Sequence, residues 1–131
     1  MKYTMTTEEY LAYIRKNYKA GESKYRNRKV VVDGVGTFAS QKEADRWFAL
    51  KALEQAGEIS GLKRQVRYEV LPEQRNSDGK LLERARRYIA DFVYQKGDET
   101  IVEDCKGYRT DAYKLKKALM LFMNGIEVLE T

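Results

Sequence analysis

Apolar residues recur at helical spacing in three segments of the chain, residues 7–19, 40–56 and 110–124. Each segment begins near a residue that can cap a helix and has a glycine at its end, as helices often do. We therefore predict three helices. The apolar stripes expected to face the core are Ala44, Trp47, Phe48 and Ala52 in the second helix, and Leu115, Leu119 and Phe122 in the third.

Shorter runs rich in β-branched and aromatic residues predict strands. The first two form a hairpin over residues 30–38, in which Asp33-Gly34 supplies the positive φ angles of a tight turn. Further strands are expected at residues 62–70, 86–94, 100–106 and 126–129. The strands 86–94 and 100–106 form a second hairpin.

The order helix, hairpin, helix, strand, hairpin, helix, strand is typical of an α/β or α+β domain with a mixed central sheet flanked by helices. We expect this domain to span residues 25–131, after an N-terminal helix and basic arm over residues 1–24. A length of 131 residues suits one hydrophobic core.

Composition excludes several kinds of chemistry. The chain has no histidine and one cysteine, Cys105, which excludes Ser-His and Cys-His nucleophiles, histidine-bound metals and an internal disulfide. An enzyme built from this chain must use carboxylates, lysines, tyrosines or a bound hard metal ion. The net charge of +5 suits a polyanionic partner. Because there is no membrane-spanning apolar run and no signal peptide, we expect a cytoplasmic protein without membrane association.

Two acidic residues on neighbouring strands form the most informative constellation. Asp91 interrupts an apolar strand, and Asp104 lies on the next strand with Lys106 on the same face. If Gln95 pairs with Thr100, Asp91 lies directly opposite Asp104, and the two carboxylates repel unless a proton or cation lies between them. Mg²⁺ suits such a pair because it takes oxygen ligands and keeps several waters. Lys106 would then orient or deprotonate a bound water.

Each of these residues also has a structural interpretation. The two aspartates can be surface residues of a half-exposed sheet, with the lysine neutralising one of them. Glu43, three residues after Ser40, either reaches back to the helix cap or is a third acidic ligand. Gln65 is either a solvated strand residue or a hydrogen-bond partner in a cleft.

Basic residues cluster in several segments, interleaved with tyrosines that can stack on bases. They either bind phosphate groups or form the solvated faces of a lysine- and arginine-rich protein. The candidate DNA-binding residues are Lys24, Arg26, Arg28, Lys29, Arg64, Gln65, Arg67, Arg86, Arg87, Lys114 and Lys116. The candidate stacking residues are Tyr25, Tyr68 and Tyr88, and Lys117 is expected to face solvent.

Four pieces of the sequence carry a resemblance to a known family. They are Ser40-x-x-Glu43-Ala44, Gln65, Tyr88-Ile89-Ala90-Asp91-Phe92 and Val102-Glu103-Asp104-Cys105-Lys106-Gly107. In this series the chain resembles the PD-(D/E)XK nuclease superfamily. Within it, the chain is similar to small phage-encoded proteins of largely unassigned function that are grouped with Holliday-junction resolvases. Ala90 stands where the motif's proline is usual, a departure that removes no ligand.

The resemblance implies a restriction-endonuclease-like fold and a metal-dependent DNA endonuclease. Asp91 and Asp104 would be the motif's two acids, Lys106 its catalytic lysine and Glu43 the helix-borne acid of resolvase-like members. The three acids and the backbone carbonyl of Cys105 would bind Mg²⁺, with Mn²⁺ as a substitute. The resemblance further implies branched, Holliday-junction-like DNA as substrate, a homodimer and, for a phage-encoded protein, the host cytoplasm.

Two other functions stay open from the sequence. One is a non-catalytic nucleic-acid-binding protein that keeps the nuclease fold and its basic face. The other is a protein-binding regulator that acts through the Met- and Phe-rich last helix.

Overall fold

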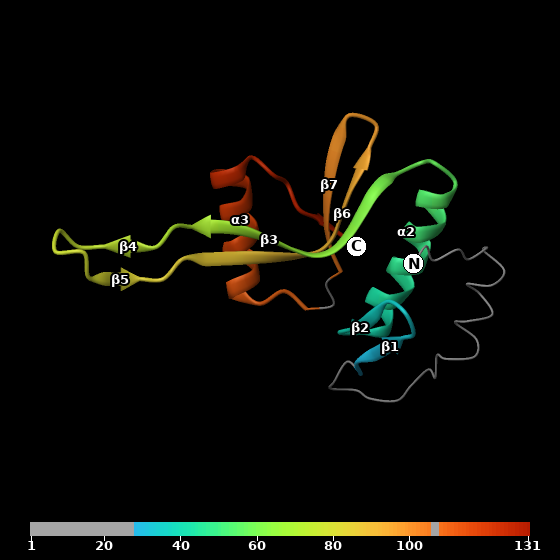
Figure 1. The fold of residues 1–131 in the computed structure, drawn as a ribbon, viewed down its shortest axis with the longest axis horizontal. Helices are drawn as coiled ribbons and strands as arrows, with labels where there is room; N and C mark the ends of the chain where they lie inside the picture. Colours follow the sequence, from blue (N-terminus) through green and yellow to red (C-terminus); the bar gives the residue numbers. More distant parts are fainter. Residues whose placement is uncertain (1–27, 106–107) are drawn as a thin grey trace. The chain divides into compact units, whose positions relative to one another are not determined.

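The computed structural model describes residues 28–105 and 108–131, which belong to two compact units (Figure 1). The boundary between the units lies between Leu62 and Lys63. The predicted helix over residues 7–19 and the predicted boundary between residues 24 and 25 lie outside the described residues. Each unit has its own elements and its own buried side chains.

The first unit contains the predicted hairpin. β1 (Val30–Val32) pairs antiparallel with β2 (Gly36–Phe38). Val32 pairs with Gly36, and of the predicted Asp33-Gly34 pair only Gly34 has a positive φ, of 76°. The hairpin is confirmed, but the positive φ at Asp33 is wrong, because the connection also includes Val35 and so is not a two-residue turn.

The helix of the first unit is also confirmed. α2 (Gln41–Gln55) begins at the predicted cap, where the Ser40 hydroxyl accepts a hydrogen bond from the backbone N–H of Glu43 at 3.1 Å. Most of the predicted apolar stripe is buried. The ring of Trp47 lies tilted against that of Phe38, with 6.1 Å between the ring centroids. The apolar face of α2 therefore packs against the hairpin.

A four-stranded sheet forms most of the second unit. Its strand order is β3 (Ser60–Leu71), β6 (Arg86–Lys96), β7 (Glu99–Asp104) and β8 (Leu129–Glu130), with the start of β3 belonging to the first unit. β6 and β7 are antiparallel, whereas β7 and β8 are parallel. The fold is therefore of the predicted mixed α+β class with a central mixed sheet.

Between β3 and β6 the chain forms a two-stranded ribbon of β4 (Gln74–Arg75) and β5 (Leu81–Glu83). The predicted loop is the tip of this ribbon, where the side chain of Asn76 accepts hydrogen bonds from the backbone N–H groups of Asp78 and Lys80, both at 3.0 Å. Every residue from 72 to 84 is exposed. The ribbon thus adds almost nothing to the core.

The last helix, α3 (Asp111–Asn124), packs on the sheet of the second unit through a face other than the predicted one. Its buried residues are Tyr113 and Met120, which join a core cluster with residues of β3, β6 and β7. Of the predicted stripe, only Leu119 packs partly against this cluster, while Leu115 is 61% exposed and Phe122 is 84% exposed. The predicted core stripe is therefore wrong for Leu115 and Phe122 and holds in part for Leu119.

Polar groups at the tips of long side chains explain which face of α3 is buried. The Tyr113 hydroxyl and the Lys117 ammonium group both reach the carboxylate of Glu130 on β8. This face can bury the apolar bodies of its side chains and still satisfy their polar ends. The hydrophobicity of the residues alone does not distinguish this face of α3 from the face that carries Leu115 and Phe122.

The ends of α3 follow the sequence signals. The Thr110 hydroxyl accepts a hydrogen bond from the backbone N–H of Tyr113 at 3.0 Å, and Gly125 ends the helix in the left-handed conformation. The N–H of Ile126 then bonds the carbonyl of Met120 at 3.2 Å. This bond holds the chain at the helix end, so β8 starts later than the predicted residue 126. Neither α2 nor α3 in the described part of the chain is long and apolar enough to span a bilayer.

We predict that Met120→Ala destabilises the protein far more than Leu115→Ala. Met120 is 0% exposed, so its truncation leaves a cavity that costs about 2–5 kcal/mol. Leu115 faces solvent, and its replacement by another good helix former is expected to cost less than about 1 kcal/mol. Urea unfolding followed by circular dichroism measures both. Equal losses, or a larger loss for Leu115→Ala, would show that the other face of α3 is buried.

Candidate active site

The register of β6 and β7 brings Asp91 and Asp104 together. Gln95 pairs with Thr100, as predicted, and the pairs continue through Phe92 with Glu103. One further step along both strands places Asp91 opposite Asp104, on one face of the sheet. Residues 96 and 99 also pair, and Gly97, with a φ of 61°, allows the tight turn between them.

The carboxylate of Asp91 is held at both oxygens. Its Oδ2 accepts a hydrogen bond from the backbone N–H of Cys105 at 2.8 Å, and its Oδ1 accepts one from the side-chain amide of Gln65 at 3.2 Å. Burial raises the pKa of Asp91 above its usual range, and the charge and hydrogen bond of the Asp104 carboxyl group raise it further, against the opposing effect of the two N–H donors. The two carboxyl groups therefore interact directly, and a positive charge beside them would be stabilised.

Asp104 is the more deeply placed of the pair. Its side chain is only 1% exposed, and its Oδ2 accepts a hydrogen bond from the hydroxyl of Tyr88 at 2.5 Å. Tyr88 itself is 3% exposed, so the prediction that it stacks on nucleic-acid bases is wrong. The phenol instead fixes the orientation of a buried carboxylate.

Gln65 lies in β3 with an unusual backbone. Its φ is 52°, and it is the one non-glycine residue among those described that has a positive φ. This left-handed conformation is costly for a residue with a long side chain. It accompanies the hydrogen bond from the Gln65 amide to Asp91. Of the two predicted roles for Gln65, the structure favours the hydrogen-bond partner.

Glu103, the neighbour of Asp104, has a separate environment. Its side chain is fully buried and accepts a hydrogen bond from the hydroxyl of Tyr94. Successive residues of a strand point to opposite faces, so Glu103 is not a further member of the aspartate pair. Two buried carboxylates of β7 thus each have a tyrosine hydroxyl from β6 as a donor.

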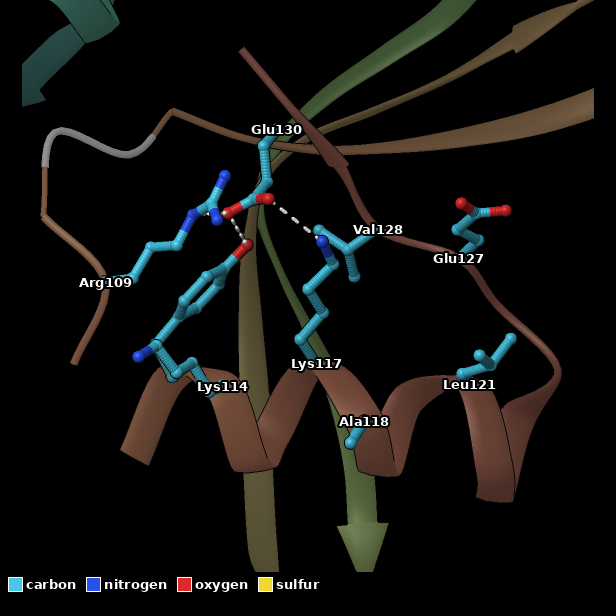
Figure 2. Close-up of a pocket in the computed structure, with 9 residues that line it drawn as sticks. Arg109, Lys114, Lys117, Ala118, Leu121, Glu127, Val128 and Glu130 are labelled. Atoms are coloured by element: carbon cyan, nitrogen blue, oxygen red, sulfur yellow. Dashed lines mark hydrogen bonds and ion pairs between the residues drawn. The ribbon is translucent and has the colours of Figure 1, made fainter. Parts of the chain in front are cut away.

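A fourth acidic residue, Glu130, was missed by the sequence analysis and lies beside the pair. It is the β8 partner of Asp104. Figure 2 shows Arg109 and Lys117 converging on its carboxylate, with the Nε of Arg109 at 2.8 Å and the Nζ of Lys117 at 2.9 Å. The Tyr113 hydroxyl also donates to this carboxylate, at 3.1 Å. These donors and cations hold the pKa of Glu130 below its usual range. The prediction that Lys117 faces only solvent is therefore wrong.

The signal for Glu130 was present in the sequence but incomplete. The terminal strand was expected at residues 126–129, which ends just before Glu130. Its parallel pairing with β7 joins segments far apart in the chain, and no local pattern specifies that pairing.

Of the other predicted catalytic and ligand residues, Cys105 adjoins the aspartate pair, because its backbone N–H bonds Asp91. Glu43 is buried on α2, where its backbone N–H bonds the Ser40 cap, and it belongs to the first unit. Lys106 lies outside the described residues. Residues 28–105 and 108–131 contain no group of three or more acidic, cysteine or histidine side chains that would hold a metal ion. A divalent ion at this site would therefore have two carboxylates from the described residues.

The predicted DNA-binding residues are mostly exposed where they are described. Lys24, Arg26 and the tyrosine Tyr25 lie outside the described residues. Arg64, Tyr68 and Lys116 are half-buried. The exposed members are Arg28, Lys29, Gln65, Arg67, Arg86, Arg87 and Lys114. Several of them have partners within the protein: Arg86 forms an ion pair with Glu83 at 3.1 Å, and the Gln65 amide donates to Asp91.

Comparison with known proteins identifies a family. A family model described as "Protein of unknown function (DUF1064)" matches residues 22–126. The matched segment includes both candidate aspartates, Gln65 and the whole of α3. No curated protein and no solved structure matches the chain.

We predict that Asp91→Asn removes a pH dependence of stability in the absence of divalent ions. Since the pKa of Asp91 is raised on folding from its ordinary value of 3.8, the native state binds more protons than the unfolded state between the two pKa values. Stability should therefore fall as the pH rises through that interval and then stay lower. The side-chain amide of the variant has no such proton to lose, so the fall should be smaller.

The measurement is the melting temperature in EDTA at a series of pH values from 3.5 to 8 in steps of about half a unit. Asp98→Asn is the matched control, because Asp98 lies exposed in the β6–β7 turn and should leave the profile unchanged. Profiles of the wild type and Asp91→Asn that run parallel would show that Asp91 does not titrate abnormally.

Proposed function

The chain belongs to the DUF1064 family, and we propose that it is a metal-dependent DNA endonuclease that hydrolyses phosphodiester bonds. The observation that carries this proposal is the meeting of Asp91 and Asp104, with the pKa of Asp91 raised by burial and by its neighbour. A carboxyl group whose pKa is shifted by burial and by a specific charged neighbour is a candidate for a functional site. The proposed ion is Mg²⁺, with Mn²⁺ as a substitute.

The donor set fits a hard divalent cation. Carboxylate oxygens are the ligands that Mg²⁺ prefers, and it is commonly bound by one or two protein carboxylates, with water and substrate phosphates as the remaining ligands. Asp91 and Asp104 supply two such groups, and in the proposal the backbone carbonyl of Cys105 is a further ligand. When bound, the ion would lower the pKa of a water molecule and withdraw charge from the phosphoryl oxygens.

The chain's own residues would orient the reacting groups. The N–H of Cys105 and the amide of Gln65 fix the plane of the Asp91 carboxylate, and the Tyr88 hydroxyl fixes that of Asp104. Such fixed outer contacts reduce the motion of ligand groups. Lys106, two residues after Asp104 in the sequence, would hold the attacking water or stabilise negative charge that develops on the phosphate.

The proposed substrate is branched, Holliday-junction-like duplex DNA, with the protein acting as a homodimer in the cytoplasm. The net charge of +5 and the exposed basic side chains of the second unit support a polyanionic partner. The preference for branches and the dimer rest on the resemblance to Holliday-junction resolvases. Two copies would present two sites to two strands.

A second candidate is a non-catalytic nucleic-acid-binding protein of the same fold. It is favoured by the hydrogen bonds that already occupy both oxygens of Asp91 and one oxygen of Asp104. In this candidate the aspartates and Tyr88 stabilise the β6–β7 hairpin and have no chemical role. DNA binding would then be independent of divalent ions and of the aspartate charges.

We predict that the purified protein cleaves labelled four-way DNA junctions in Mg²⁺ but not in EDTA. Asp91→Asn and Asp104→Asn should each lower the cleavage rate by about 100-fold or more, since each replaces a charged carboxylate ligand of the proposed Mg²⁺ ion with a neutral amide. Asp98→Asn is the control for loss of one acidic charge from the same hairpin. A linear duplex of equal length measures the preference for branches.

Absence of cleavage in every condition, with junction binding retained and a normal melting temperature, would reject the nuclease and favour the non-catalytic candidate. Equal cleavage by Asp91→Asn and the wild type would also reject the proposed site. A failure to bind any DNA at low salt would reject both candidates.

A further inference from the structure

A hollow of about 360 Å³ lies between α3 and the C-terminal segment of the second unit (Figure 2). Its volume is within the range of small-molecule sites in proteins. All residues that line it come from positions 109–130, so it is formed within one unit. No residue of the proposed endonuclease site lines this hollow. Of the DNA-binding residues predicted from the sequence, Lys114 is the one that lines it.

One end of the hollow is polar and carries an excess of positive charge. Arg109, Lys114 and Lys117 line this end together with Glu130, whereas Glu127 lies on the side of Leu121 (Figure 2). Glu130 is bound by both Arg109 and Lys117, so one carboxylate faces two cations. Arg109 uses its Nε for this ion pair, and its side chain is largely exposed. An arginine engaged in this way can still donate from its terminal nitrogens to a phosphate.

Apart from Glu127, the remainder of the hollow is apolar. Ala118 and Leu121 line it from α3, and the buried Val128 lines it from the C-terminal segment. An inorganic anion gains no binding free energy from such a surface. A flat ring system attached to a phosphate gains binding free energy at both ends of the hollow, because the ring covers apolar side chains and the phosphate contacts the cations.

The polar end of the hollow adjoins the candidate catalytic carboxylates. Glu130 and Asp104 are partners in the β7–β8 pairing, and paired residues of adjacent strands lie about 5 Å apart. Tyr113 spans the two, since its hydroxyl bonds Glu130 and the charge of Asp104 acts on it. A group bound in the hollow would therefore lie beside the aspartate pair.

From these contacts we infer that the hollow binds one nucleotide of the DNA strand, with the phosphate at Arg109 and Lys117 and the base against Ala118, Leu121 and Val128. This inference rests on the proposed function, which supplies DNA as the substrate. The bound nucleotide would be a neighbour of the one whose phosphate is cleaved. It assigns Arg109 and Lys117 as substrate-binding residues. Glu130 then holds the two cations apart and in place before the phosphate arrives.

The first test measures binding of three probes in EDTA: thymidine 5′-monophosphate, thymidine and inorganic phosphate. Titration calorimetry should give an affinity for the nucleotide at least about 10-fold higher than that for either fragment, since only the nucleotide engages both ends. Equal affinity for nucleotide and phosphate would overturn the inference and leave an anion site only. No binding of the nucleotide would also overturn it.

The location is tested by filling the hollow from its exposed rim. Ala118→Phe should weaken nucleotide binding at least about 10-fold by occupying the space of the base. Ala112→Phe is the matched control, because Ala112 is also exposed on α3 but does not line the hollow. Neither position is buried, so both variants should fold, which the melting temperature checks. Equal affinities of the two variants would place the nucleotide elsewhere.

A charge variant separates the two ends. Arg109→Gln should lower affinity for the nucleotide about 10-fold while leaving thymidine binding unchanged, since only the phosphate contact is lost. Lys96→Gln, at an exposed position of the β6–β7 hairpin, is the control for loss of one positive charge. If Arg109→Gln lowered the affinity for thymidine as much as that for the nucleotide, the assigned phosphate contact would be contradicted. An equal loss of nucleotide affinity in Lys96→Gln would also contradict it.

Failure of this inference is distinguishable from failure of the proposed function. If the nucleotide binds as described and no DNA is cleaved, the pocket stands and the endonuclease does not. If junctions are cleaved in Mg²⁺ and Ala118→Phe cleaves at the rate of Ala112→Phe, the endonuclease stands and the pocket does not.

Discussion

The close approach of two carboxyl groups, from Asp91 on β6 and Asp104 on β7, is the constraint on which the second unit's chemistry depends. Two like charges in a partly dry environment are unfavourable unless a proton or a cation compensates them. The β6–β7 register enforces this approach, since slipping by one residue would move one aspartate to the opposite face. Such a slip would also break the pairing of the apolar residues that form the core. The stability of the sheet therefore maintains an electrostatic arrangement that is itself unfavourable.

The surroundings of the pair reduce this cost without removing it. Asp91 receives two N–H donors, and Asp104 receives the hydroxyl of Tyr88. Hydrogen bonds of this kind stabilise a charged carboxylate but do not neutralise it. At Glu130, next to Asp104, the negative charge is compensated in another way, because two cationic side chains bind one carboxylate. A divalent cation bound by Asp91 and Asp104 would balance their two charges in the same way.

The sequence predicted those parts of the fold that depend on neighbours in the chain. The caps at Ser40 and Thr110 and the register of the β6–β7 hairpin follow from short-range signals, and the structure confirms them. The buried face of α3 was not predictable in the same way, because the helix has apolar residues on two faces. The choice between them depended on polar contacts of Tyr113 and Lys117 with a strand that pairs only in the folded chain.

The same limit applies to the candidate site. Asp91 and Asp104 were found because a hairpin is local, whereas Glu130 depends on a parallel strand from the end of the chain. The positive φ of Gln65 had no sequence signal, since glutamine rarely adopts it. Lys106 follows from the sequence motif, and its position is outside the described residues.

The central claim is that the two aspartates bind a divalent cation, and paramagnetic broadening by Mn²⁺ in NMR spectra tests it most directly. At Mn²⁺ concentrations well below that of the protein, the backbone amide of Cys105 and the side-chain amide of Gln65 should broaden first, because both donate to Asp91. Excess Mg²⁺ should reverse the effect. Broadening that starts at other acidic residues, or that spreads evenly over the surface, would contradict the claim.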